Sequence, residues 1–482
     1  MLKKIYTGIK ALPDSAKSSV FFILASLITK GLNIISTPFF TRTMSTAEIG
    51  VVTTFGTYSS IIGTIIGLGL TSGAFSVAMK EYPDRRDAYT SSVMTLSVIA
   101  AAAAFIPFVL FRDGIGSLMD IEPGLVILMA GGFVLNPVLT FWLSRERYEY
   151  RYKWPFWISV LSSVLAVAVS MAGVLICKDR PGSDLPFVRI LTSSCVIYLF
   201  DIGIMIHLAR RGRTYVNKTY WKFSLVTGLP LVVHALAKNL FDSSDRIMIL
   251  KFEGESAVGI YGTLYSFSTL SLIVWYAINA SLVPFLFEKI EKQDHVKIKK
   301  VTNLILAAYA FVCFILMICA PEIIKLLTTD EYLEAVNMIP PTAAGIFFTS
   351  LYSMYSTVAL YYKKPKYIMI STLAATAFNI ITNAIFIRQF GYIAASYTTL
   401  ASFIVLSVMQ YFAMRKVHGA DDIYDEKVFL LLSAVIILFV VVCNFLYPLT
   451  VLRYVILAAM IVFGIFKRKL LKEILLEMKN KR

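Results

Sequence analysis

Residues 18–40 read SSVFFILASLITKGLNIISTPFF. A helix of about 20 apolar residues crosses the hydrocarbon core of a bilayer, and this run has that length with Lys30 as its one charge. It is too long for the core of a signal peptide and lacks a small-residue cleavage site, so we expect it to remain as the first membrane span. Similar runs recur along the chain, and we predict fourteen membrane-spanning helices, near 18–40, 50–79, 90–111, 123–143, 155–177, 187–208, 224–241, 256–286, 301–320, 335–361, 367–387, 392–414, 428–446 and 450–466.

The composition agrees with this prediction. The 482 residues are 57% hydrophobic and 16% charged, whereas a soluble protein has about 25% charged residues. A soluble enzyme and a secreted domain are therefore excluded, and the predicted fold class is an all-α, polytopic integral membrane protein. The five cysteines all fall in apolar runs, so we interpret them as buried thiols and expect no metal site.

The net charge of +16 would suggest nucleic acid in a soluble protein, but topology explains it here. Lysine and arginine collect in cytoplasmic loops of membrane proteins. With the N-terminus inside, the predicted cytoplasmic pieces hold 34 of the 46 basic residues. We therefore predict an N-in/C-in topology and no nucleic-acid partner.

A weak internal repeat suggests the domain organisation. The segment 45–50 before the second span is similar to the segment 255–259 before the eighth span. We predict a cytoplasmic N-terminus (1–17), a lobe of six helices (18–208), a second lobe of six (222–414) and an extra helix pair (428–466). Residues 467–482 then form a basic cytoplasmic tail whose leucines and lysines are spaced as in an amphipathic or a solvated helix. Two parallel repeats of this kind are typical of transporters.

No predicted loop is long enough for a catalytic domain, and the chain has no G-x-x-x-x-G-K phosphate-binding loop. We therefore predict that the protein is not an enzyme and does not hydrolyse ATP. No cofactor is expected beyond a coupling ion, for which H⁺ and Na⁺ are the candidates.

Charged groups inside a bilayer are costly and mark candidate functional sites. Lys30 lies roughly 18 Å into the first span at 1.5 Å per residue. With Asn33 and Thr37 it forms a polar stripe along one face of the predicted helix, and Arg42 follows in the first outer loop. We interpret Lys30 either as a cation that meets an anionic substrate or as the partner of a carboxylate in the bundle.

The seventh span repeats this pattern. His234, Lys238, Asp242 and Asp245 share one helical face, and Lys238 can contact an anionic substrate or pair with Asp242 at i,i+4. Asp201 in the sixth span, on the face of Ser194 and Tyr198, is a candidate proton or cation site or a partner for a lysine. Asp242 and Asp245 are also candidates for ion coupling or charge pairing.

Two neutral patterns have a packing interpretation. We expect Asn379 and Asn383, one turn apart in the eleventh span, to form interhelical hydrogen bonds. The small-residue pairs Gly63/Gly67 and Gly69/Gly73 predict close helix contact.

Several motifs carry a family resemblance. The segments Pro38–Arg42 and Met44–Gly50 resemble the opening signature of bacterial polysaccharide lipid flippases. The mid-chain motifs Gly228–Pro230, Asp242–Arg246 and Gly259–Gly262 are similar to that family's second signature, and Pro321–Ile324 with Tyr332–Ala335 to its ninth-to-tenth connection. These flippases are the polysaccharide branch of the multidrug/oligosaccharidyl-lipid/polysaccharide exporter superfamily.

The resemblance implies a transporter that works by alternating access in the bacterial cytoplasmic (inner) membrane. Its substrate would be an oligosaccharide repeat unit on undecaprenyl pyrophosphate, flipped to the outer leaflet for O-antigen, capsule or exopolysaccharide synthesis. A polymerase and glycosyltransferases would be its assembly partners. Two alternatives stay open: a multidrug or cation antiporter of the same superfamily, and a multispan acyltransferase or polymerase of envelope glycans.

Overall fold

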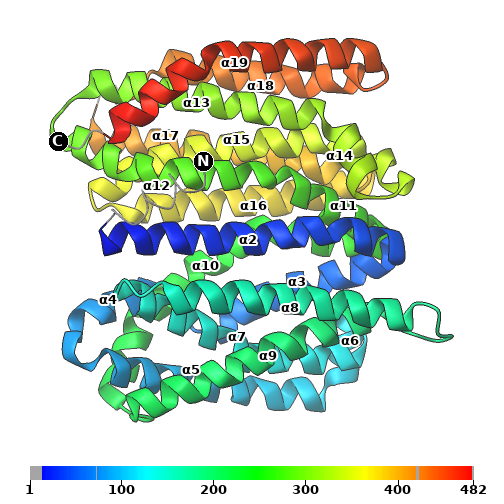
Figure 1. Ribbon diagram of the computed structural model, residues 1–482, viewed down its shortest axis with the longest axis vertical. Helices are drawn as coiled ribbons and strands as arrows, with labels where there is room; N and C mark the ends of the chain where they lie inside the picture. Colours follow the sequence, from blue (N-terminus) through cyan, green and yellow to red (C-terminus); the bar gives the residue numbers. More distant parts are fainter. Residues whose placement is uncertain (1–12, 72, 420–422, 480–482) are drawn as a thin grey trace. The chain divides into compact units, whose positions relative to one another are not determined.

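The computed structural model describes residues 13–71, 73–419 and 423–479, and within these it is helical and has no strands. The chain divides into two compact units, Met1–Ser243 and Ser244–Arg482, here called the N-terminal and C-terminal units (Figure 1). The division falls inside the long helix α10 (Lys218–Glu253) and lies after residue 222, where the predicted second lobe begins. The predicted lobe boundaries remain a prediction.

The N-terminal unit contains α2 (Asp14–Thr43), α3 (Thr46–Ile66), α4 (Gly73–Glu81), η1 (Pro83–Arg85), α5 (Arg86–Leu110), α6 (Arg112–Met119), α7 (Pro123–Tyr148), α8 (Lys153–Cys177), α9 (Leu185–Gly212) and most of α10 (Lys218–Glu253). Ser45 begins α3 with a capping box, in which its hydroxyl accepts from the Glu48 amide at 3.2 Å and its own amide donates to the Glu48 carboxylate at 2.7 Å. The sequence Ser45–Glu48 of the opening signature thus has a structural role.

The C-terminal unit contains the rest of α10, then α11 (Glu255–Ser268), α12 (Leu270–Glu291), α13 (His295–Ile318), α14 (Ala320–Leu327), η2 (Asp330–Met338), α15 (Ile339–Tyr361), α16 (Pro365–Phe390), α17 (Ala394–His418), α18 (Glu426–Leu446) and α19 (Thr450–Lys479). α15 is buried along nearly its whole length and is the centre of this unit. The side chains of the predicted amphipathic tail, from residue 467 on, lie outside the described part of the structure.

Thirteen of the described helices are long and apolar enough to cross a membrane, and Thr450–Phe466 forms a shorter apolar helix. The all-helical, multi-pass fold is therefore confirmed. The count of fourteen spans remains a prediction, because the last predicted span is the shorter helix. The N-in/C-in orientation also remains a prediction.

The overlong second run is broken. α3 ends at Ile66 and α4 begins at Gly73, with Leu68 and Gly69 at positive φ between them. A Cβ on Gly69 would lie 2.5 Å from the Gly228 carbonyl oxygen, so the backbone of α10 approaches the break too closely for any other residue. The close approach thus joins Gly69 to Gly228 of α10, a partner that the predicted pairs Gly63/Gly67 and Gly69/Gly73 did not include.

Asn379 and Asn383 of α16 form a buried hydrogen-bond network, as expected. The Asn379 amide donates to Ser402 of α17 at 3.2 Å and its carbonyl accepts from Asn383 at 3.0 Å and from Ser244 of α10 at 3.3 Å. Thr398 of α17 donates to the Asn383 carbonyl. The network joins three helices where no water competes.

We expect Asn379→Ala to lower the free energy of unfolding by about 1–2 kcal/mol, because it leaves buried partners unsatisfied. Thermal unfolding of the purified protein in detergent would measure this. The control is Asn337→Ala, since Asn337 is exposed in η2. Equal melting temperatures for the two variants would contradict a structural role for the network.

Candidate functional site

α2 carries the first set of predicted site residues and has three distinct faces. One face is buried and includes Phe22 and Phe40, and near it the Thr29 hydroxyl accepts from Ser163 of α8 at 3.3 Å. A second face is apolar but exposed, with Ile35 at 75% exposure. The third is polar and also exposed, and it holds Lys30 and Asn33.

Thr37 and Arg42 complete the predicted set on α2. Thr37 is partly buried and donates to the Asn33 carbonyl at 2.9 Å. Arg42 is exposed in the last turn of α2, which runs one residue beyond it, so it lies on the helix itself and its position outside the bilayer remains a prediction.

The exposed faces of α2 have different neighbours in a bilayer. Lipid chains can cover the apolar face, but a lysine in lipid costs roughly 2.5–3.5 kcal/mol. The polar face therefore does not suit lipid, and we expect water, substrate or polar side chains beside it. α2 thus has the surface expected of a helix that lies between the lipid and an aqueous pathway.

The second set lies on α10, and here the structure shows a charge pair. Lys238 and Asp242 form a hydrogen-bonded ion pair, and their side chains remain 43% and 37% exposed. This is the i,i+4 pair considered above, and both partners stay accessible to a ligand. Asp245 is buried and accepts from the Tyr261 hydroxyl at 2.5 Å and the Arg246 amide at 2.8 Å. His234 is partly buried, and its Nδ1 has no hydrogen-bond partner among the described residues.

Asp201 differs from the other carboxylates. It is 1% exposed on α9, and neither carboxylate oxygen has a hydrogen-bond partner in the part of the chain that the structure describes. It lies one helical turn beyond Tyr198, whose hydroxyl donates to the Leu128 carbonyl at 2.7 Å. A buried carboxylate without partners is costly in its charged form, which makes Asp201 a candidate cation or proton site.

A cavity within the N-terminal unit lies next to this position. It has a volume of about 630 Å³ and is bounded by α3, α7, α9 and α10. We call it the inner cavity. Its described lining has no charged side chain, but hydroxyl and amide groups are abundant: Ser59, Ser60, Thr64, Thr71, Asn136, Thr140, Ser193, Ser194 and Tyr198.

Sequence reasoning missed the inner cavity. Its signal was present in the second run, where glycines and hydroxyl residues share a face, but this pattern was interpreted as helix packing. Gly56, Gly63, Gly67 and Gly69 line the cavity. At its edge the Asn239 amide of α10 donates to the Thr64 hydroxyl and, at 3.3 Å, to the Ser60 carbonyl.

Gly56→Leu tests whether the inner cavity is used. A Cβ on Gly56 meets no atom within 4 Å, so leucine can enter the open space without a clash, and it favours the helix. If substrate occupies the cavity, the leucine side chain takes part of the space that the substrate needs. We then expect the transport rate to fall about tenfold, since overpacking a filled space costs about 1–3 kcal/mol. The rate would be measured in proteoliposomes.

The matched control is Gly114→Leu in α6, where a Cβ also meets no atom within 4 Å. It should transport at the wild-type rate. Unchanged transport by folded Gly56→Leu would contradict a role for the cavity.

Comparison with known proteins agrees with this architecture. Residues 15–290 match the family model described as "Polysaccharide biosynthesis protein". The chain belongs to this family. Residues 230–385 also match the MatE model. The resemblance to polysaccharide flippases of the exporter superfamily is thus confirmed.

The relatives are transporters. The chain is 21% identical over 409 residues to the "Probable low-salt glycan biosynthesis flippase Agl15" of Haloferax volcanii, with 82% of each chain covered. Among solved structures, lipid II flippase MurJ in an inward closed conformation matches with a TM-score of 0.69, 17% identity and coverage of 94% of this chain and all of MurJ. An inward-facing multidrug resistance MATE transporter matches with a TM-score of 0.59, 14% identity and coverage of 83% and 97%.

These matches confirm the prediction of a multi-pass transporter fold and of a protein that is not an enzyme. The alternative of a multispan acyltransferase or polymerase of envelope glycans is therefore set aside. A multispan acyltransferase would need a histidine within a span beside an amide or a carboxylate, and His234 with Asn239 or Asp242 is the set that α10 offers. Asn239 and Asp242 bond instead to Thr64 and Lys238.

Proposed function

We propose that this protein flips a lipid-linked oligosaccharide from the cytoplasmic to the outer leaflet by alternating access. The observation that carries the proposal is the inner cavity, because a neutral set of hydroxyl and amide groups suits the hydroxyls of a sugar chain. Family membership across residues 15–290 and the similarity to the glycan flippase of H. volcanii support a glycan as the cargo.

The polar face of α2 is proposed to meet the anionic end of the substrate. A pyrophosphate group carries about two negative charges and cannot cross hydrocarbon without compensation. Lys30 is exposed on this face. Lys238 can serve the same purpose when it exchanges Asp242 for the substrate.

Asp201 is proposed as the site of the coupling cation, either H⁺ or Na⁺. Of the three predicted coupling carboxylates, Asp242 pairs with Lys238 and Asp245 with Tyr261, whereas Asp201 has no hydrogen-bond partner among the described residues. When a conformational change exposes such a carboxylate, its cation can leave or enter. Cation binding is then linked to the conformation, and an ion gradient can drive the change.

The carrier is proposed to be undecaprenyl pyrophosphate in the cytoplasmic membrane of a bacterium, with a polymerase and glycosyltransferases as assembly partners. The second candidate is a multidrug or cation antiporter, which the MatE match over residues 230–385 favours. Such a protein would need carboxylates for its cationic substrate, and none is among the described residues that line the inner cavity.

A deletion strain distinguishes these functions. If the proposal holds, loss of the gene removes surface polysaccharide and lipid-linked repeat units accumulate on the cytoplasmic leaflet, while drug susceptibility is unchanged. Normal surface glycan together with increased susceptibility to cationic drugs would support the antiporter instead.

A further inference from the structure

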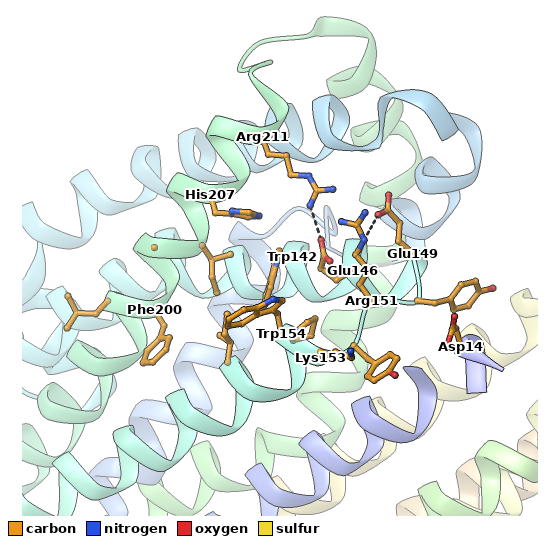
Figure 2. Close-up of a pocket in the computed structure, with 17 residues that line it drawn as sticks. Asp14, Trp142, Glu146, Glu149, Arg151, Lys153, Trp154, Phe200, His207 and Arg211 are labelled. Carbon is orange, nitrogen blue, oxygen red and sulfur yellow. Dashed lines mark hydrogen bonds and ion pairs between the residues drawn. The ribbon is translucent and has the colours of Figure 1, made fainter. Parts of the chain in front are cut away.

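A second, larger space lies at the predicted cytoplasmic end of the N-terminal unit, where α7 ends, α8 begins and α9 passes beside them (Figure 2). We call it the cytoplasmic groove, and its volume is about 1160 Å³. It has both aromatic and charged lining residues, among them Trp142, Trp154, Arg151, Lys153 and Arg211. Neither the substrate pathway nor the coupling site proposed above uses it.

A buried arginine holds the carboxylates of the groove. Arg145 is 1% exposed and donates to Asp87, to Glu146 at 2.5 Å and to Glu149 at 3.1 Å. Arg211 donates to Asp87 at 2.9 Å and, as Figure 2 shows, to Glu146 at 3.3 Å. Each of these carboxylates thus accepts from at least one guanidinium, which balances its negative charge and weakens its repulsion of an anion.

Further cations raise the positive charge of the groove. Arg86 and Arg151 lie 3.9 Å and 3.3 Å from Glu149, so four arginines face three carboxylates. Lys153 adds a charge with no ion pair among the described residues, whereas Asp14 is paired with Lys17 at 3.2 Å. The lining residues alone are balanced, with Arg151, Lys153 and Arg211 against Asp14, Glu146 and Glu149. The positive charge of the surroundings comes from residues behind the lining, namely Arg86, Arg145 and Lys17 against Asp87.

The start of α8 provides further donors. α8 begins at Lys153, and the preceding Tyr152 makes no side-chain cap. The first amide groups of a helix have no partner within it, and together with the helix dipole they attract anions. In α8 these are the amides of Lys153 and Trp154, because Pro155 has no N–H and the Phe156 amide donates to the Tyr152 carbonyl. The exposed Arg151 and Lys153 side chains lie at the same place.

The walls of the groove are apolar and open to lipid. Leu199 of α9 is 71% exposed and Trp154 of α8 is 74% exposed. Ile158 and Phe200 continue the same surface. Tryptophan is typical of the boundary between lipid and water, and the positive-inside rule places the charged end of the groove on the cytoplasmic side.

We infer that the cytoplasmic groove binds an anionic, phosphate-headed membrane lipid. The phosphate contacts Arg151, Lys153 and the first amides of α8, with His207 as a further donor, and the acyl or prenyl chain lies along Leu199 and Phe200. The exposed apolar walls beside Arg151 and Lys153 favour a bulk anionic phospholipid as the occupant, and a polyprenyl phosphate carrier is the alternative that the test distinguishes. The inference does not depend on the proposed function, because binding is measured without transport.

Native mass spectrometry of the purified full chain tests the inference. Phosphatidylglycerol is titrated against phosphatidylcholine with identical chains. We expect selective retention of phosphatidylglycerol, and a loss of affinity of at least about tenfold in Arg151→Ala/Lys153→Ala, since each basic residue contributes to anionic lipid binding. Arg151→Gln/Lys153→Gln repeats the charge removal with longer side chains in case the alanine variant does not fold.

The matched control is Lys364→Ala/Lys366→Ala, which removes two exposed cations at the start of α16, on the same predicted side of the membrane. It should retain phosphatidylglycerol as the wild type does. Displacement of phosphatidylglycerol by undecaprenyl monophosphate would identify the carrier lipid as the occupant, and its failure to displace would identify the phospholipid. The inference is overturned if the wild type shows no preference for the anionic lipids, or if groove and control variants lose affinity equally.

Discussion

Lys30→Ala is expected to reduce transport of a lipid-linked oligosaccharide by about 10- to 100-fold. A hydrogen bond to a charged group contributes about 1.5–3 kcal/mol, and no other side chain is proposed to replace the Lys30 ammonium on α2. The protein should remain folded, because Lys30 is exposed and does not belong to the buried face of α2. Transport in proteoliposomes, with the amount of reconstituted protein measured, gives the comparison.

Two further variants of α2 make this prediction specific. Lys30→Arg keeps the charge and should retain most of the activity. Ile35→Ala changes the exposed apolar face of the same helix and should transport at the wild-type rate. If Lys30→Ala transports as fast as Ile35→Ala, the polar face of α2 does not contact the substrate.

Asp201→Asn is expected to abolish stimulation of transport by an imposed ion gradient. Asparagine keeps the size of the side chain but cannot exchange a charge-balancing cation, so substrate movement should lose its link to the gradient. Transport would be measured with a pH gradient and, separately, with a sodium gradient across the liposome membrane. The gradient that accelerates the wild type but not Asp201→Asn identifies the coupling ion.

Asp179→Asn is the matched control, because Asp179 is an exposed carboxylate in the connection between α8 and α9. It should respond to the gradient like the wild type. A full response by Asp201→Asn would assign coupling elsewhere, and Asp242 would be the next residue to test.

The fold could be predicted largely from apolar run lengths, because a bilayer permits few alternatives to helices. The position of the break in the second run could not be predicted in this way. A run as long as 50–79 can tilt, kink or project beyond the bilayer. The position of its break depends on the approach of Gly228 to Gly69, a tertiary contact between residues far apart in sequence. The repeat likewise suggested a lobe boundary before α10, whereas the compact units divide within it.

The candidate site was predicted in part. Helical spacing placed Lys30 and Asn33 on one face of α2 and Lys238 near Asp242, because a helix fixes such neighbours locally. The isolation of Asp201 could not be predicted from the sequence, since it depends on which side chains the neighbouring helices place around it. The ion pairs of Arg145 were also missed, because its neighbouring charges suggested only a cytoplasmic loop.

Leaflet transfer by the purified full chain is the most direct test of the account. A fluorescent lipid-linked oligosaccharide is placed in one leaflet of proteoliposomes, and a membrane-impermeant quencher reports how much reaches the other. The account predicts transfer by the wild type, and little transfer by Lys30→Ala or by empty liposomes. Failure of folded wild-type protein to move the lipid-linked oligosaccharide, with transport of a lipophilic cation in its place, would contradict it.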